Sequence, residues 1–248
     1  MAEDKKETSN DFFNLFAKFA KESYDQVLAQ TSFYKKLQTD ALKNLKDCQH
    51  VVDLGCGTGN LAIELAKQGI QVTAIDNNEV MLGQLEKKAL HAGVEDKIEV
   101  VKQDADSLVL DSGRYDGAAI INVLEFTNQP YHILDKVYSS LKLGGVCVVS
   151  GPKPNKDPKI LFDKLIQEFS DKGKLNSIED DLDVVRKIAA SLKQKEDHFF
   201  TTERMQEVLC NFVGFDEVIN TDKISGFDTF LCQGYFVSAK KLVDYNSL

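Results

Sequence analysis

The segment that most constrains this chain is Val51–Asn60, in which a short β-branched run leads into three glycines and then into a helical pattern. Gly55, Gly57 and Gly59 occupy alternate positions in it. Glycine is needed where the backbone takes a positive φ or touches a ligand. The start of the following helix offers unpaired N–H groups and the positive end of the helix dipole. The segment therefore predicts a strand–loop–helix unit that binds a ligand, in preference to a simple tight turn.

The alternation of apolar strand and amphipathic helix repeats along the chain. Strands are expected at residues 51–54, 71–75, 98–102, 115–122 and 146–149, and helices at residues 33–45, 61–68, 79–92 and 130–141. Continuous apolar strands between amphipathic helices are typical of a parallel sheet that is covered on both faces. The pattern predicts an α/β fold with a doubly wound sheet.

We expect a single domain with four parts. These are an N-terminal helical region (residues 1–46), an α/β core (47–150), a helical insertion (151–197) and a C-terminal helix with two strands (198–248). The insertion is expected to contain helices at residues 159–172 and 179–195, and the C-terminal part a helix at 202–212 and strands at 217–221 and 229–239.

Composition excludes several classes of protein. A net charge of −9, from 30 Lys+Arg against 39 Asp+Glu, argues against a nucleic-acid partner, which requires a basic surface. Five scattered cysteines without a C-x-x-C pair favour a reducing compartment over disulfides or structural zinc. We expect no signal peptide and no membrane span, and therefore a cytoplasmic protein. The acidic run Glu179–Asp183 is interpreted as the first turn of a helix, so no metal site is expected.

Three aspartates indicate the kind of ligand. Asp53 precedes the first glycine by two residues, where a carboxylate suits a cationic amine or sulfonium better than a phosphate. The glycine spacing also departs from the G-x-G-x-x-G pattern of nicotinamide sites. Asp76 ends the second strand, where it would reach the hydroxyls of a ribose or cap the next helix. Asp104 follows the third strand and would accept from an adenine amine or make a local turn.

At these residues the chain resembles the class I S-adenosylmethionine-dependent methyltransferases, in particular the small-molecule type of quinone biosynthesis. The resemblance covers about residues 19–150 and returns at residues 198–215. It rests on Val51–Gly59, Ala74–Asp76 with Met81 and Leu82, Gln103–Ala105, Tyr115–Asp116 with Asn122–Glu125, Leu141–Gly145 and an aromatic–Asp pair in Ala20–Asp25.

The resemblance implies a mostly parallel, seven-stranded Rossmann-like sheet and S-adenosyl-L-methionine as cofactor. It implies that the loop with Asp53, Gly55, Cys56, Gly57 and Gly59 holds the methionine part of the cofactor and that Asp76 holds the ribose. The other implied cofactor contacts are Asn77, Met81, Asp104 and Ala105 around the adenine, Asn122 near the methyl group, and Tyr24 closing over the cofactor.

The implied reaction is in-line methyl transfer to a small-molecule acceptor, for which the protein mainly aligns the reactants and excludes water. A general base is needed only if the acceptor must lose a proton, and Tyr24 and His198 are the candidate catalytic residues. Phe126 stands where many relatives have His, which indicates an apolar wall. Phe162 and Phe169 of the insertion are candidates for contact with the acceptor, or ordinary core residues.

Other classes stay open at this point. They are a non-methylating relative that uses the same cofactor, a regulatory protein that only binds it and an NAD-dependent oxidoreductase. The identity of the acceptor and the oligomeric state do not follow from the sequence.

Overall fold

The computed structural model describes residues 23–154, 158–192, 200–220 and 234–242. The described residues contain seven strands: β1 (His50–Leu54), β2 (Gln71–Asp76), β3 (Ile98–Lys102), β4 (Tyr115–Ile121), β5 (Leu141–Pro152), β6 (Glu217–Asn220) and β7 (Gly234–Lys240). The helices are α2 (Ser32–Leu45), α3 (Asn60–Lys67), α4 (Glu79–Ala92), α5 (Pro130–Ser140), α6 (Pro158–Asp171), α7 (Glu179–Leu192) and α8 (Thr202–Glu207).

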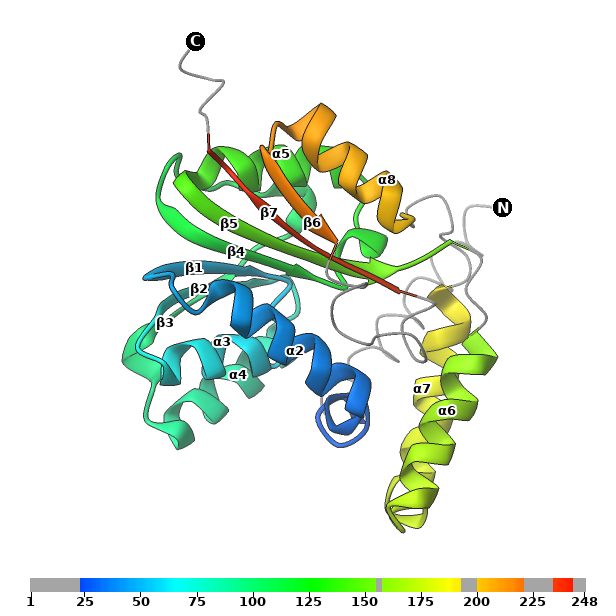
Figure 1. Cartoon of the computed structure of the whole chain (residues 1–248). Coiled ribbons are helices and arrows are strands. Elements are labelled where there is room, and N and C mark those ends of the chain that lie inside the picture. Colours follow the sequence, from blue (N-terminus) through cyan, green and yellow to red (C-terminus); the bar gives the residue numbers. More distant parts are fainter. Residues whose placement is uncertain (1–22, 155–157, 193–199, 221–233, 243–248) are drawn as a thin grey trace, which may run out of the picture.

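The strands form one sheet in the order β3-β2-β1-β4-β5-β7-β6. Strands β1 to β5 pair in parallel, whereas β7 runs antiparallel to both of its neighbours. Helices α2, α3 and α4 lie on one face of the sheet, and α5 and α8 lie on the other (Figure 1). The prediction of a doubly wound, mostly parallel seven-stranded sheet is therefore confirmed.

Each face of the sheet has its own hydrophobic core, because successive residues of a strand point to opposite faces. On β1, Val51 belongs to the core under α2, α3 and α4, and Val52 belongs to the core under α5 and α8. By the same alternation, Asp53 points to the face that α2 covers. The helices begin at side-chain caps: Thr31 accepts from the backbone of Tyr34 to start α2, and Asn78 accepts from Val80 and Met81 to start α4.

Two boundaries differ from the sequence-based expectation. Strand β5 begins at Leu141, where the helix was expected to end, because residues on both sides of Gly144 pair with neighbouring backbone. Gly144 donates to the carbonyl of Lys241, and Lys241 donates back to Gly145. The C-terminal helix, expected as one piece over residues 202–212, is α-helical to Glu207 and then continues as a π-helix over Val208–Val213.

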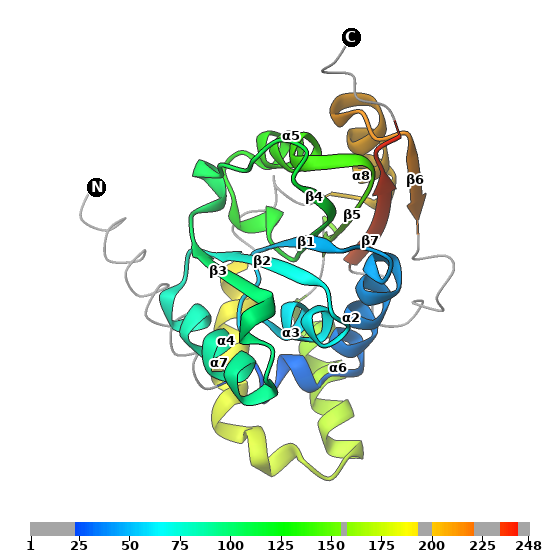
Figure 2. The same cartoon turned by 90° about the vertical axis from the view of Figure 1, so that its left-hand side faces the viewer.

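The helical insertion, which we define as α6, α7 and the 3-10 turn Leu175–Ile178 between them, projects from the end of the molecule where α2 begins (Figures 1 and 2). Its buried side chains form a third apolar cluster that is distinct from the two cores flanking the sheet. Val27, from the segment that precedes α2, is the fully buried member of this cluster from outside the insertion. The expected helix before residue 23 and the expected strand residues before Gly234 lie outside the described part of the chain. Among the described helices, none is long and apolar enough to cross a membrane.

The glycine at the start of α3 provides a test of this packing. Gly59 has a φ of 76°, and a Cβ placed on it would overlap the Cγ atom of Leu85 in α4. Gly69 has a φ of 86° but open space around it, so it is a matched control. We expect Gly69→Ala to cost about 1 kcal/mol for the left-handed backbone and Gly59→Ala about 1–3 kcal/mol more for overpacking. Urea unfolding of the two variants measures the difference, and equal losses would contradict the contact between α3 and α4.

Candidate functional site

A cavity lies at the carboxyl ends of β1 and β4, between the sheet and α2. Its lining residues come from the segment before α2, from α2 itself, from the glycine loop and from the ends of the two strands; they are Tyr24, Tyr34, Leu37, Gln38, Ala41, Asp53, Gly55, Cys56, Leu61 and Ile121. Ligands of open α/β sheets bind at the carboxyl ends of the strands, where the strand order reverses. That reversal lies between β1 and β4 in this sheet.

The three glycines of the loop serve two different purposes. All three have positive φ, but Gly55 and Gly59 also sit so close to Val123 and Leu85 that a Cβ on either would overlap those side chains. A Cβ on Gly57 would meet only the sulfur of Met81, at 4.0 Å. Gly55 and Gly59 therefore bring the backbone into the core, whereas Gly57 leaves open space beside Met81, where the second strand and α4 meet.

Asp53 is a buried acid at the floor of the cavity. Its side chain is 3% exposed, and its Oδ2 atom has no hydrogen-bond partner among the described residues. Burial, and then the nearby charge of Asp76, raises the pKa of this carboxyl to about 7. A buried carboxyl with a free oxygen is costly by itself, and a cationic ligand would relieve that cost. The position predicted for the methionine end of the cofactor thus has the chemistry that such a ligand requires.

Asp76 holds the glycine loop in place from the end of β2. Its Oδ2 accepts from the backbone N–H of Gly57 at 2.9 Å, and its Oδ1 accepts from Asn78 at 2.8 Å. Burial raises the pKa of Asp76, and the backbone donors oppose that rise. Each carboxylate oxygen has a second lone pair, so the same group can bind the loop and still accept from ribose hydroxyls. The alternative role as helix cap belongs to Asn78.

The predicted adenine contacts surround the space next to Asp76. Met81 is buried in the first turn of α4, and Asn77 is exposed with its Nδ2 atom 3.5 Å from Asp104. Asp104 is exposed and accepts from the backbone of Asp106, so it makes the local turn that was its alternative interpretation. Ala105 is half-buried. The structure brings these residues together, and their contact with adenine stays a prediction.

Asn122 and Phe126 follow β4, the strand whose last residue, Ile121, lines the cavity. Asn122 is the one non-glycine residue with a positive φ, 55°, among the described residues, and its N–H donates to the carbonyl of Ser150 in β5 at 2.9 Å. Such conformations carry strain and concentrate at functional sites. Phe126 ends the short 3-10 helix Leu124–Phe126 and is half-buried. Their roles next to the methyl group stay predictions.

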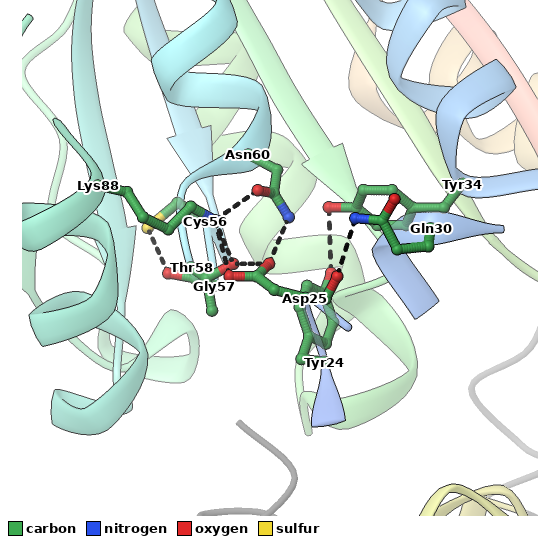
Figure 3. Close-up of polar contacts among 9 residues, drawn as sticks. All are labelled: Tyr24, Asp25, Gln30, Tyr34, Cys56, Gly57, Thr58, Asn60 and Lys88. Carbon is green, nitrogen blue, oxygen red and sulfur yellow. Dashed lines mark hydrogen bonds and ion pairs between the residues drawn. The ribbon is translucent and has the colours of Figure 1, made fainter. Parts of the chain in front are cut away.

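Tyr24 and Tyr34 close the cavity on the side of α2 (Figure 3). The Tyr24 hydroxyl donates to the Tyr34 hydroxyl at 3.2 Å, and the rings meet edge to face at 5.9 Å. Burial raises the pKa of both phenols above the ordinary value. Both therefore stay protonated at neutral pH, and Tyr24 is placed to donate hydrogen bonds rather than to act as a base.

A polar cluster beside the glycine loop escaped the sequence analysis. Asp25 accepts from Thr58 and Asn60, and the Lys88 amine of α4 donates to Asp25, Thr58 and Asn60 (Figure 3). Only the aromatic–Asp pair that contains Asp25 had a signal in the sequence. Lys88 looked like one of many surface lysines, because its partner lies 63 residues away in the chain.

The remaining candidates lie away from the cavity or outside the described residues. Phe162 and Phe169 are 8% and 2% exposed and belong to the cluster of the helical insertion, so their contact with an acceptor stays a prediction. His198 lies outside the described residues.

Cys56 lines the cavity, but burial and the charge of Asp53 raise the pKa of its thiol, so it is not an activated nucleophile. The described residues contain no cluster of three or more His, Cys, Asp or Glu side chains suited to a metal ion.

Comparisons with known proteins give the family of the chain. A family described as "Methyltransferase domain" matches residues 51–145. The carboxy-S-adenosyl-L-methionine synthase of Nautilia profundicola is 30% identical over 227 residues, which are 84% of this chain and 88% of that protein. The ubiquinone biosynthesis O-methyltransferase of Psychrobacter cryohalolentis is 31% identical, over 44% of this chain and 42% of that protein.

Solved structures show the same fold. The N-methyltransferase NodS of Bradyrhizobium japonicum, in complex with S-adenosyl-L-homocysteine, has a TM-score of 0.61 at 14% identity, with 93% of this chain and 97% of that chain covered. A SAM-dependent methyltransferase of Archaeoglobus fulgidus has a TM-score of 0.58 at 19% identity, with 88% and 97% covered.

The fold and the matched relatives thus define an α/β enzyme. The chain belongs to the class I S-adenosylmethionine-dependent methyltransferases, a family of enzymes that transfer methyl groups from S-adenosyl-L-methionine to small molecules.

The raised pKa of Asp53 predicts how stability depends on pH. An acid whose pKa is higher in the folded state than in the unfolded state binds its proton more tightly when folded, so the free energy of unfolding falls as pH rises from about 4 to about 7. The Asp53→Asn variant lacks this fall in the free energy of unfolding. We therefore expect its free energy of unfolding, relative to that of the wild type, to increase by up to about 4 kcal/mol over that pH interval. Urea unfolding of the ligand-free proteins at several pH values measures it. Asp40→Asn, which removes a buried acid paired with Lys36, is the control.

Substitution of Asp76 tests the ribose site. We expect Asp76→Ala to weaken binding of S-adenosylhomocysteine at least about tenfold, because hydrogen bonds to a charged group are lost. Glu79→Gln, which removes an exposed acid three residues further along, should leave the affinity unchanged. Calorimetric titration measures both. An unchanged affinity in Asp76→Ala would remove Asp76 from the ribose site.

Proposed function

We propose that this enzyme transfers the methyl group to a small, partly apolar acceptor that sits above the carboxyl ends of β4 and β5, under the helical insertion. The observation that carries the proposal is the buried Asp53 carboxyl, which lines the cavity and whose Oδ2 lacks a hydrogen-bond partner among the described residues. A cation is the ligand that this group favours, and the cofactor of the family carries both an ammonium and a sulfonium.

The cofactor assignment follows the order of the strands. Asp53 at the end of β1 would hold the methionine ammonium, Asp76 at the end of β2 the ribose, and the residues around Met81 and Asp104 the adenine. Tyr24 and Tyr34 would cover the methionine end, because both line the cavity opposite Asp53. Asn122 would lie near the sulfur, because its backbone joins the ends of β4 and β5.

The reaction requires the protein mainly to align the cofactor with the acceptor. The bound cofactor supplies a methyl group on a cationic sulfur, so a nucleophile that attacks this carbon displaces neutral S-adenosylhomocysteine. Tyr24 and Tyr34 are protonated at neutral pH. Phe126 has an apolar side chain at the position where many relatives have His, which could act as a base. The described residues at the cavity therefore favour an acceptor that can attack the methyl group without a strong base from the protein. The side chains around the cavity also exclude water.

The acceptor side is a narrow, mixed surface. Ile121 lines the cavity, and Ser150 pairs with it in the register of β4 and β5. The Ser150 hydroxyl is buried and has no hydrogen-bond partner among the described residues, so it offers a polar contact next to an apolar one. Hydroxylated aromatic compounds that are acidic enough to ionise without a base from the protein match this combination, and the O-methyltransferase relative is named for ubiquinone biosynthesis.

A second candidate reaction is favoured by one comparison. The relative with the largest coverage given above is a carboxy-S-adenosyl-L-methionine synthase, whose product by its name carries a carboxylate on the cofactor. Arginine is the usual bidentate partner of carboxylates, and the three arginines of the sequence lie elsewhere. Arg114 pairs with Glu99 before β4, Arg186 lies over the ring of Phe162, and Arg204 pairs with Glu207 on α8. Methyl transfer is therefore the preferred proposal.

We propose that the chain is one functional unit in which the described parts of residues 1–46 and 151–197 cover the core formed by the described parts of residues 47–150 and 198–248. We place the enzyme in the cytoplasm without a nucleic-acid partner, as supported by its net charge of −9 and by the free thiols of Cys48, Cys56, Cys147 and Cys210.

The test is a product assay on the purified protein. With S-adenosylmethionine and a panel of catechols, quinols and small amines, we expect release of S-adenosylhomocysteine that depends on one acceptor class, detected by mass spectrometry together with the methylated acceptor. Asp76→Ala should lower the signal at least about tenfold at cofactor concentrations well below those that saturate the wild type.

Two other results would change the conclusion. A cofactor-derived product heavier than S-adenosylmethionine by one carboxylate, after incubation with a small-molecule cell extract, would establish the second candidate. Micromolar binding of NAD without binding of S-adenosylhomocysteine would overturn both.

A further inference from the structure

Three consecutive residues before α2 contact three separate parts of the protein. Ser23 donates its hydroxyl to the Asp181 carboxylate of α7 at 2.7 Å. Tyr24 lines the cavity, and Asp25 binds the glycine loop together with α4 (Figure 3). A displacement of this short segment would therefore change the helical insertion, the cavity wall and the cofactor loop together.

Asp25 is the most heavily bonded of the three. Its Oδ1 accepts from the Thr58 hydroxyl at 2.8 Å and from Asn60 Nδ2 at 2.9 Å, and its Oδ2 pairs with Lys88 Nζ at 2.8 Å. Lys88 Nζ also donates to Asn60 Oδ1 at 2.5 Å and to Thr58 at 3.2 Å. The cluster thus ties the segment to the two residues that flank Gly59 and to the helix that carries Met81.

This cluster is polar and partly exposed, so it is not a requirement of the hydrophobic core. The side chains of Lys88 and Asp25 are 31% and 37% exposed. An isolated ion pair at such exposure contributes little to stability. Four side chains joined by charge-assisted hydrogen bonds instead hold one another in a fixed arrangement. They thereby fix the position of the segment before α2, which carries Tyr24.

The same segment is the attachment of the helical insertion. Val27 is fully buried in the cluster of α6 and α7. At the start of α2, the backbone and hydroxyl of Ser32 donate to Glu168 of α6 at 2.7 and 2.9 Å. Glu168 is paired with Lys172, which also donates to the carbonyl of Gln30 at 3.4 Å. The insertion is therefore bonded to residues 23–32 at both of its helices.

We propose that Asp25 is a positioning residue: by binding Thr58, Asn60 and Lys88 it sets Tyr24 against the cofactor and couples the glycine loop to the helical insertion. Occupation of the cofactor site then orders the cover over the acceptor, so the two binding events assist each other, as any coupling between sites must be reciprocal. This inference rests on the function proposed above, because it assigns the cavity to the cofactor.

The experiment compares Asp25→Asn with the wild type and with Glu64→Gln. Glu64 is an acid of α3 in an exposed ion pair with Lys67, away from the cavity, and is the matched control. Binding of S-adenosylhomocysteine is measured by calorimetry, and hydrogen exchange of α6 and α7 is measured with and without it. For the wild type and Glu64→Gln we expect binding and slower exchange in both helices.

For Asp25→Asn we expect about tenfold weaker binding and no ligand-dependent protection of α6 and α7 at saturation, while exchange of the sheet in the free protein is unchanged. Lys88→Met should reproduce both effects, and Asp25→Glu, which keeps the charge, should restore part of the protection. A purely local structural role would change exchange in the free protein and leave the ligand-dependent protection intact.

The outcomes are distinguishable. Wild-type affinity and full protection in Asp25→Asn and Lys88→Met would overturn the inference and leave the proposed function standing. Absence of S-adenosylhomocysteine binding in the wild type would overturn the proposed function and the inference with it. If Asp25→Asn fails to fold by circular dichroism while Lys88→Met folds with normal protection, the inference is also wrong.

Discussion

The rest of this structure depends on the burial of one carboxyl group. Asp53 lies at the end of β1, in the middle of the sheet, with a pKa raised to about 7 and an oxygen without a hydrogen-bond partner among the described residues. A strand residue at this position could have been apolar at no cost to the core, since its neighbours Val51, Val52 and Leu54 are. The unfavourable burial of the Asp53 carboxyl has a physical explanation if the cavity next to it holds a cation. Tyr24, Tyr34, Gly55 and Cys56 line the same cavity as Asp53.

Most of the fold could be predicted because its signals are local. The strands β2 and β3 and the helix α4 begin and end within a residue of the expected positions, since apolar runs, an Asn cap and a terminal Gly93 mark them directly. The boundary at Leu141 and the π-helix after Glu207 could not be predicted, because pairing of Leu141 with Tyr115 of β4 decides the first and tertiary packing of Val208 and Leu209 decides the second. Neither partner is adjacent in sequence.

The residues of the site also divide into those that local sequence signals predict and those that they do not. Asp53, Asp76 and the glycines follow strands in the sequence, so their convergence at one edge of the sheet follows from the topology alone. Tyr34, Gln38 and Lys88 lie on helices, where a side chain that faces a cavity and one that faces solvent have the same spacing. The Asp25 cluster joins residues that are 28 to 63 positions apart in their hydrogen bonds to Lys88, which no local pattern encodes. The different surroundings of the glycines, close packing at Gly55 and Gly59 and open space at Gly57, also depend on residues far away in the sequence.

The separate apolar cluster of the helical insertion has a consequence for how the protein unfolds. A unit whose buried side chains pack on one another and on Val27, apart from the cores that flank the sheet, can open at a free energy below that of global unfolding. The helical insertion is then the part that a protease reaches first, whereas the sheet and the two cores that flank it stay folded. Residues of α6 and α7 that do not contact residues 23–32 can therefore change without disturbing Asp53 or Asp76. A family built this way is free to acquire new acceptors while it retains one cofactor.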